Sequence, residues 1–166
     1  RLRLRLAAAG VDGFIVPRAD EHQGEYVPRA AERLAWITGF HGSAGTAVIL
    51  KDRAAVFVDG RYTIQAEQEV DGRVFERCHV GERTPIAWIA ETAGRGARIG
   101  YDPRLHTPAE ISRWQRVLAR AGVELAALEG NPLDAIWNGG AAMPLAPVVP
   151  HHEAFAGESV ASKRRR

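Results

Sequence analysis

The residues Asp59-Gly60-Arg61-Tyr62 place a carboxylate, a guanidinium and a phenol directly after an apolar run, residues 54–58. A guanidinium held at the end of a buried strand can bind a carboxylate or a carbonyl group in a forked geometry. The same guanidinium can instead form an internal ion pair with Asp59. Residue types alone do not decide between these two roles. Arg61 is therefore the leading candidate for ligand binding, and Asp59 is its competing partner.

A second candidate is Ser43, which lies between Gly42 and Gly45 and partly matches the G-x-S-x-G nucleophile elbow. The elbow needs a strand before the serine and a helix after it, whereas here a helical pattern precedes and a strand pattern follows. A phosphate loop would also need a following helix and a Gly-Lys-Ser/Thr sequence, and this stretch has neither. We interpret Gly42 and Gly45 as positions that let a loop pass close to the sheet, with Ser43 bonding local backbone.

The polar segment at residues 18–26 holds a third set of candidates, Asp20, His22, Glu25 and Tyr26. A shared metal site would use such groups, but the sequence has neither an i, i+4 histidine pair on a helix nor a His-Glu-x-x-His motif. Taken singly, Asp20 is typical of a turn or cap and His22 of a hydrogen-bonded surface residue. Glu25 and Tyr26 are typical of polar contacts that fix a loop. Each of these local roles is favoured over metal binding.

The composition is that of a soluble globular protein, with 46% hydrophobic and 25% charged residues in a chain of 166. No apolar run approaches the ~20 residues that cross a bilayer, and no segment is typical of a signal peptide. The formal net charge is +2, but residues 163–166 are all basic and their positive charge is larger than this total. The rest of the chain is therefore net negative and lacks the basic face that nucleic-acid binding requires. The single Cys78 favours a reducing compartment. We predict a cytoplasmic protein with no nucleic-acid or membrane partner.

Helical and strand patterns alternate along most of the chain, which predicts an α/β domain with a mixed sheet. The two strands at 46–50 and 54–58, joined by a polar turn, predict a hairpin that delivers Asp59 and Arg61 at its end. Threonine-proline pairs at Thr84 and Thr107 predict capped helix starts. Predicted helices cover residues 1–9, 28–38, 61–70, 86–93, 108–121 and 133–137. Predicted strands cover residues 13–16, 46–50, 54–58, 74–80, 98–101 and 123–128.

The composition changes at residue 139, where Gly, Ala and Pro without periodicity replace the alternating elements. We predict a domain at residues 1–138, a linker at 139–158 and the start of a second domain at 159–166, where helix formers resume. The chain begins with Arg1 rather than Met, and its last residues, 163–166, are a basic run without a helix-ending residue. Both ends are therefore expected to be cut from a longer protein.

A series of ordered motifs then suggests a family. The motifs are Phe14-Ile-Val-Pro17, Asp20-x-His22-x-x-Glu25-Tyr26, Arg33, Gly39-Phe40, Gly42-Ser-Ala-Gly-Thr46, Asp59-Gly-Arg-Tyr62, Gly100-Tyr-Asp102-Pro103 and Asn131-Pro-Leu-Asp134-Ala-Ile-Trp137. Together they resemble the N-terminal domain of the cytosolic type of Xaa-Pro aminopeptidase (aminopeptidase P), in the creatinase/prolidase group. Two departures are Pro132, where Leu or a similar residue is usual, and Arg18, where a small residue is common.

The resemblance implies a creatinase-type fold, with a roughly six-stranded mixed sheet, one hairpin and flanking helices. It implies a parent enzyme that removes the N-terminal residue preceding proline from short peptides. Two divalent metals, Mn or Zn, would lie in a C-terminal domain outside this chain, so no catalytic residue or metal ligand is expected here. This domain would help to bound the substrate pocket and could also oligomerise, for example as a homodimer, and Arg61 would approach the substrate. The other expected structural or pocket-lining residues are Asp20, His22, Glu25, Tyr26, Gly42, Ser43, Gly45, Asp59 and Tyr62.

Two other functions stay open from the sequence. A stand-alone binding or oligomerisation module would keep the fold without peptidase activity, and the coding sequence downstream of Arg166 would distinguish it. An independent hydrolase would use Ser43 as its nucleophile. Ester or peptide hydrolysis by this chain, abolished by Ser43→Ala, would support that third hypothesis.

Overall fold

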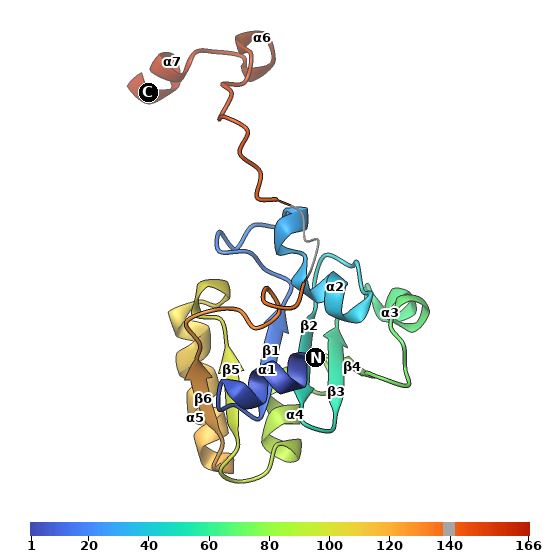
Figure 1. Ribbon diagram of the computed structural model, residues 1–166. Helices are drawn as coiled ribbons and strands as arrows, with labels where there is room; N and C mark the ends of the chain where they lie inside the picture. The colour runs from blue at the N-terminus through green and yellow to red at the C-terminus, as the bar shows by residue number, and fades with distance from the viewer. Residues whose placement is uncertain (138–141) are drawn as a thin grey trace.

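A six-stranded mixed sheet forms the centre of the computed structural model, which describes residues 1–137 and 142–166 (Figure 1). The strand order is β4-β3-β2-β1-β5-β6, and β2 runs antiparallel to both of its neighbours while the other pairs are parallel. The strands are β1 Gly13–Pro17, β2 Thr46–Leu50, β3 Ala54–Val58, β4 Glu76–His79, β5 Arg98–Tyr101 and β6 Glu124–Ala127. The predicted mixed α/β fold and its β2–β3 hairpin are confirmed.

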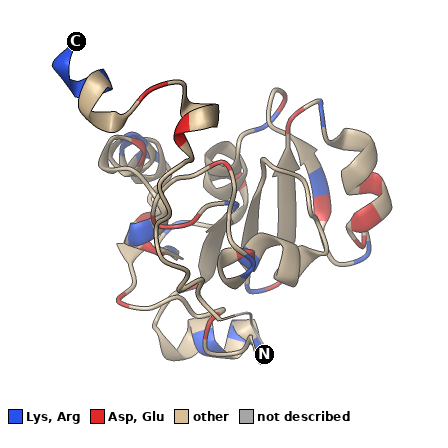
Figure 2. Ribbon diagram, turned by 90° about the horizontal axis from the view of Figure 1, so that it is seen from above, with Lys and Arg blue, Asp and Glu red and all other residues tan. Residues whose placement is uncertain are grey.

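Helices cover both faces of this sheet, as the view from above shows (Figure 2). One face packs against α1 (Leu2–Ala8), α2 (Arg33–Thr38) and α3 (Thr63–Glu69). The other face packs against α4 (Pro85–Thr92) and α5 (Pro108–Ala121). The domain is therefore a three-layer α/β/α arrangement, in which neither face of the central strands meets solvent.

Alternating side chains of the central strands divide between two hydrophobic cores. In β1, Phe14 and Val16 enter the core under α1 and α2, whereas Ile15 enters the core under α4 and α5. In β3, Val56 and Phe57 divide in the same way, and both are fully buried. Because the side-chain period of a strand is two, burial on both faces requires a continuous apolar run rather than an alternating one.

The two predicted threonine caps are present. The side-chain oxygen of Thr84 accepts a hydrogen bond from the Ala87 backbone N–H at 3.2 Å, and that of Thr107 accepts one from Glu110, also at 3.2 Å. Each satisfies one of the unpaired amides of a helix start. At the other end of α5, Gly122 has a φ of +72°, the left-handed conformation that commonly ends a helix.

Two predicted helices differ from the structure near the candidate site. The helix predicted for 28–38 is divided into a 3₁₀ turn, Arg29–Ala31, and α2, because Glu32 has φ −73° and ψ 49°, outside the helical region. The helix predicted for 61–70 begins only at Thr63. The chain turns before it, with the Tyr62 amide donating to the Asp59 carbonyl oxygen at 2.9 Å.

Other predictions need smaller corrections. The predicted strand 74–80 is shorter and covers only β4. The predicted linker contains a short helix, α6 (Glu153–Ala156), while α7 (Val160–Arg165) follows the Ser159 cap in the predicted helical stretch. A 3₁₀ turn at Pro103–Leu105, opened by Asp102, was not predicted. These short elements depend on single turns, for which sequence periodicity carries little signal.

The helix predicted for 133–137 is instead a series of hydrogen-bonded turns that hold the chain against the domain. Asn131 donates to the Asp102 carboxylate at 3.1 Å, and the side chain of Leu133 is fully buried. Asp134 receives a two-pronged ion pair from Arg33, with Nε–Oδ1 at 2.7 Å and Nη2–Oδ2 at 3.0 Å. Trp137 stacks on Trp36 with a centroid distance of 5.7 Å. The segment has only one helix-type backbone hydrogen bond, from the Trp137 amide to the Leu133 carbonyl oxygen at 2.9 Å, and these tertiary contacts hold it against the domain.

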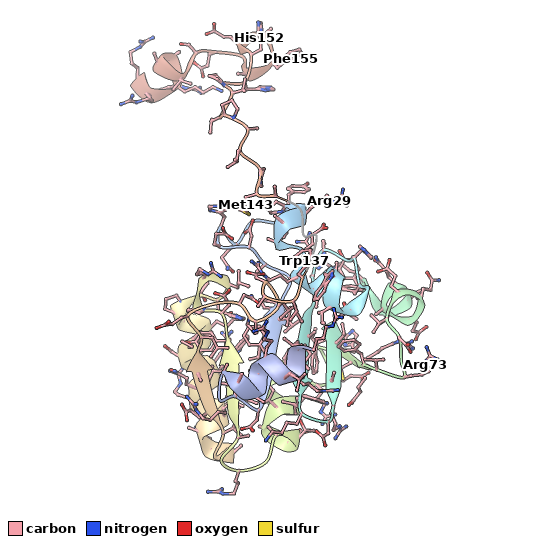
Figure 3. All side chains as sticks on the ribbon, in the orientation of Figure 1. Arg29, Arg73, Trp137, Met143, His152 and Phe155 are labelled. Carbon is pink, nitrogen blue, oxygen red and sulfur yellow. The ribbon has the colours of Figure 1, made fainter. Side chains whose placement is uncertain are left out.

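The predicted domain boundary between residues 138 and 139 lies outside the described residues. Beyond it, α6 and α7 bury no residue, and apolar side chains such as Met143 and Phe155 are exposed (Figure 3). Across residues 1–137 and 142–166, no helix combines the length and the apolar character needed to cross a membrane.

Replacing Leu133 by Ala is expected to lower the free energy of unfolding by about 2–5 kcal/mol, because it removes a fully buried side chain at the seam between the turn segment and the sheet. Urea unfolding followed by circular dichroism measures this. Leu4→Ala is the matched control, since Leu4 is 77% exposed, and it should change the free energy little. Equal effects of the two substitutions would contradict the docking of residues 131–137.

Candidate functional site

The Asp59–Arg61 pair forms a compact fork at the end of β3. Asp59 Oδ1 accepts from the Arg61 backbone N–H at 2.9 Å and from Nε at 3.0 Å, and Oδ2 accepts from Nη2 at 2.8 Å. The Arg61 side chain is nevertheless 67% exposed. Asp59 occupies only the Nε–Nη2 edge of the planar guanidinium, so the Nη1 side can still receive a second acceptor. The internal ion pair and a ligand contact are thus compatible.

This hydrogen bonding shifts the pKa values of both partners. The Arg61 side chain, and then its backbone amide, lower the pKa of the Asp59 carboxyl below its ordinary value of 3.8, and the charge of His79 adds to the effect. Conversely, the hydrogen bond to Asp59 raises the pKa of Arg61, with smaller contributions that include the charge of Glu25. The fork therefore stays doubly charged at neutral pH.

The phenol ring of Tyr62 connects Arg61 to the glycine-rich loop. The Arg61 guanidinium carbon lies 5.1 Å from the centre of the Tyr62 ring, within cation–π distance. The Tyr62 ring meets Phe40 edge-on, with centroids 5.8 Å apart and an interplanar angle of 83°. The Tyr62 hydroxyl is hydrogen-bonded to the Ser43 hydroxyl at 2.5 Å. Ser43 bonds this side chain rather than the local backbone that the sequence suggested.

Packing on Phe40 explains both glycines of the loop. A Cβ at Gly42 would lie 2.2 Å from the Phe40 ring, which no real contact permits. A Cβ at Gly45 would lie 3.0 Å from the same ring and 3.2 Å from Leu34. Phe40 itself is 1% exposed, so the loop closes directly over a buried ring. The loop does pass close to the core of the domain, and the aromatic ring beneath it is the feature that the sequence did not reveal.

The 18–26 segment forms a turn around Asp20, as its residue type suggested. Asp20 Oδ1 accepts from the backbone amides of His22 at 3.1 Å and Gly24 at 3.2 Å, and the carboxylate is 4% exposed. His22, Glu25 and Tyr26 are exposed, and Tyr26 is 90% exposed. Only Glu25 is near enough to Arg61 for its charge to raise the Arg61 pKa.

Among the described residues, no hydrogen bond pairs Ser43 with a histidine, and the candidate metal ligands do not form a cluster. The nearest histidine in sequence, His41, lies 3.6 Å from Glu69, while the Ser43 hydroxyl is bonded to Tyr62. Within the described part of the chain, no three His, Cys, Asp or Glu side chains gather in a way that could hold a metal ion. Burial, followed by the charge of Glu76, raises the pKa of the Cys78 thiol to about 11, which makes it a poor nucleophile.

The Asp-x-Arg fork occurs at two further positions that sequence reasoning did not single out. Asp71 and Arg73 repeat it, with distances of 2.9 Å to the backbone amide and 2.7 Å to Nη2. Asp102 and Arg104 repeat it at 3.1 Å and 2.8 Å. The Asp-x-Arg spacing in the sequence could have predicted these two forks. Arg73 points outward on the flank of the domain (Figure 3), and its side chain is 90% exposed.

His79 was also missed as a neighbour of the site. It ends β4, and its Nδ1 accepts a hydrogen bond from the Gly81 amide at 3.0 Å, which places the proton of the neutral ring on Nε2. A Cβ at Gly60 would lie 3.4 Å from that Nε2 atom. His79 also lines a surface hollow of about 440 Å³ between α3 and β4, together with Thr63 and Glu67. Parallel pairing of β3 and β4 brings these residues together, and local sequence patterns do not show it.

Residues 1–135 match the family described as the Creatinase/Prolidase N-terminal domain, and the chain belongs to this family. Among curated proteins, aminopeptidase P2 of Arabidopsis thaliana is 37% identical over 158 residues, which cover 93% of this chain and 22% of that protein. Xaa-Pro aminopeptidase 2 of Homo sapiens is 33% identical over 159 residues, covering 95% and 24%. The chain thus spans about a quarter of the length of these relatives, and the resemblance seen in its motifs is confirmed.

Solved structures agree with this assignment. X-prolyl aminopeptidase from Caenorhabditis elegans, described as a cytosolic enzyme with a di-nuclear active site, superimposes with a TM-score of 0.83 and 27% identity, covering 93% of this chain and 26% of that one. The N-terminal domain of the cytoplasmic peptidase PepQ from Mycobacterium tuberculosis H37Rv gives a TM-score of 0.61 at 23% identity, covering 81% and 94%. The second match shows the fold alone, and it concerns a domain solved separately.

Replacing Gly42 by Ala is expected to lower the free energy of unfolding by about 1–3 kcal/mol, because the new Cβ collides with the Phe40 ring and the loop must shift. Chemical denaturation measures the change. Gly130→Ala is the control, since a Cβ there meets no described heavy atom within 4 Å. A stable Gly42→Ala variant with an unshifted Phe40 ring in its crystal structure would contradict the packing described here.

The Asp59 carboxyl is expected to titrate below 3.8, and Arg61→Gln should move its pKa upward toward that ordinary value. A lowered folded-state pKa means that the pair stabilises the fold above about pH 4, and that this stabilisation is lost as the pH falls through the folded-state pKa. Carboxyl ¹³C chemical shifts followed against pH give both values. Asp71, whose pKa the Arg73 fork lowers to about 2, is an internal control that should not respond. An Asp59 midpoint that ignores Arg61→Gln would rule out the fork in solution.

Proposed function

We propose that this chain is the non-catalytic N-terminal domain of a dimetal Xaa-Pro aminopeptidase, which removes the N-terminal residue preceding proline from short peptides. The observation that carries the proposal is identity of 33–37% to Xaa-Pro aminopeptidases and aminopeptidase P over 93–95% of the chain. The matched 158 or 159 residues exceed the 138 of the predicted sheet domain, so the similarity includes part of the segment that follows it. This supports continuity with the rest of such an enzyme rather than a stand-alone module.

In this proposal the sheet domain, residues 1–138, is joined by a linker at 139–158 to a second domain that starts at 159–166. The two divalent metals belong to a catalytic domain outside this chain. The di-nuclear site of the Caenorhabditis elegans relative supports this. Hydrolysis is assigned to the parent enzyme and none to this chain alone. The cytosolic relative supports a cytoplasmic location.

The part assigned to this chain is to bound the substrate pocket and to contact the peptide through Arg61. The Nη1 side of its guanidinium suits a peptide carbonyl or a terminal carboxylate, both of which are acceptors. Its position after β3 lies at the carboxyl ends of the parallel strands, the edge where α/β sheets bind ligands. A fixed cation that meets the far end of the peptide favours short substrates over long ones.

Arg61→Ala in the full-length enzyme is expected to lower kcat/KM for Xaa-Pro peptides about 30-fold to 1000-fold, because it removes a charged hydrogen bond to the substrate in a desolvated pocket, equivalent to about 2–4 kcal/mol. Steady-state kinetics on a proline-containing dipeptide and tripeptide measure the change. Unchanged kinetics in a correctly folded variant would reject the role of Arg61.

Arg73→Ala is the matched control for this experiment. It removes an arginine with the same fork geometry to an aspartate two residues earlier, on a flank of the domain (Figure 3) and without a described aromatic ring against its guanidinium. Removal of that surface pair should leave kcat/KM unchanged. Similar decreases for both variants would indicate that the effect of Arg61→Ala arises from folding rather than from substrate binding.

A further inference from the structure

We infer that Tyr62, tethered by Ser43, is a positioning residue that holds the Arg61 guanidinium in the orientation that receives the peptide. This inference rests on the proposed function for the identity of the ligand, a carbonyl or carboxylate group of a short peptide. The orientation itself follows from the geometry of the site. Ser43 thereby has a structural role in binding.

Comparison of the three Asp-x-Arg forks shows what is particular to Arg61. All three share the contacts of the carboxylate with the backbone amide, Nε and Nη2, so the fork by itself does not define a site. Arg104 is held by a carboxylate that is itself immobilised, because Asp102 is 1% exposed and also accepts a hydrogen bond from Asn131. Of these three forks, only that of Arg61 has a described aromatic ring against its guanidinium.

The Tyr62 ring is held at two points, which makes it a firm support. Its edge-on contact with Phe40 fixes the body of the ring against a side chain that is 1% exposed. Its hydroxyl, at the far tip, is bonded to Ser43 in the loop that Gly42 closes over Phe40. Rotation of the ring would break one of these two interactions. One connected series of contacts therefore runs from the loop and the buried Phe40 ring, through the Tyr62 phenol, to the Arg61 guanidinium.

Support of this kind matters because Arg61 is mostly exposed. A free arginine side chain samples many rotamers, and this rotamer entropy is lost when the side chain binds in one orientation. Asp59 fixes one edge of the guanidinium, and the Tyr62 ring limits movement of its plane. A group ordered before binding loses less entropy on binding. We therefore expect removal of the tether to weaken binding without removing the charge.

The main test is a double-mutant cycle in the parent enzyme. Tyr62→Phe keeps the ring and removes the hydroxyl, and Ser43→Ala removes its partner. Each should lower kcat/KM about twofold to tenfold, the factor that one hydrogen bond of ordinary net strength represents, mainly through KM. The double variant should be no worse than either single variant, because both break the same bond. Tyr101→Phe, a buried tyrosine in the other core, is the control and should have no effect.

The same pair of substitutions is then made in an Arg61→Ala background. If Tyr62 acts through Arg61, both substitutions should be silent there. Full decreases in kcat/KM in that background would overturn the inference, as would the absence of any decrease in the native background.

A second measurement separates this inference from the proposed function. In the 166-residue chain, ¹⁵N spectra report the order of the Arg61 Nε–H group without any substrate, with Arg73 as an internal reference. Tyr62→Phe and Ser43→Ala should reduce the order of Arg61 and leave Arg73 unchanged. If Arg61 loses order but Arg61→Ala does not affect peptide hydrolysis, positioning stands and the proposed function fails. If Arg61 order is unchanged while Arg61→Ala abolishes activity, the proposed function stands and positioning by Tyr62 is wrong.

Discussion

Burial of the central strands on both faces is the constraint on which the rest of the structure depends. Helices cover both sides of the sheet, so β1, β2 and β3 contain no charged residue and polar groups are confined to the strand ends. Five of the six strands run in the same direction, and their carboxyl ends therefore meet along one edge. Asp59, His79 and Asp102 all stand at this edge. The topology thus gathers groups that are far apart in the sequence.

At these strand ends, aspartates first act as turn-forming residues. Asp20, Asp59 and Asp102 each accept a hydrogen bond from the backbone amide two residues later, which reverses or redirects the chain after a strand. Where an arginine occupies that later position, the same carboxylate also holds its guanidinium. Such forks follow from local geometry and are not functional in themselves. The surroundings of Arg61, namely the Tyr62 ring and the loop behind it, give that fork a different character from the fork at Arg73.

Sequence reasoning succeeded where the physical cause is local. The threonine caps of α4 and α5, the left-handed Gly122 and the β2–β3 hairpin each depend on a few neighbouring residues, and all were predicted. It failed where distant contacts decide the conformation. The break before α2 directs Arg33 toward Asp134, which is 101 positions away, and the 131–137 segment is ordered by docking rather than by helix formation. Periodicity reports neither effect.

The sequence by itself determined the alternation of helices and strands, the hairpin, and the placement of Asp59 and Arg61 directly after a buried strand. Family motifs in the same sequence pointed to the domain type. Only the tertiary structure decided how these groups meet: the Asp59 fork leaves one side of Arg61 available, and Tyr62 joins Ser43 across 19 positions. The physical reason is that reversal of the chain through β2 and β3 returns it to the loop where β2 began. The contact between Tyr62 and the glycine-rich loop depends on the packing of both against Phe40, which no local sequence pattern encodes.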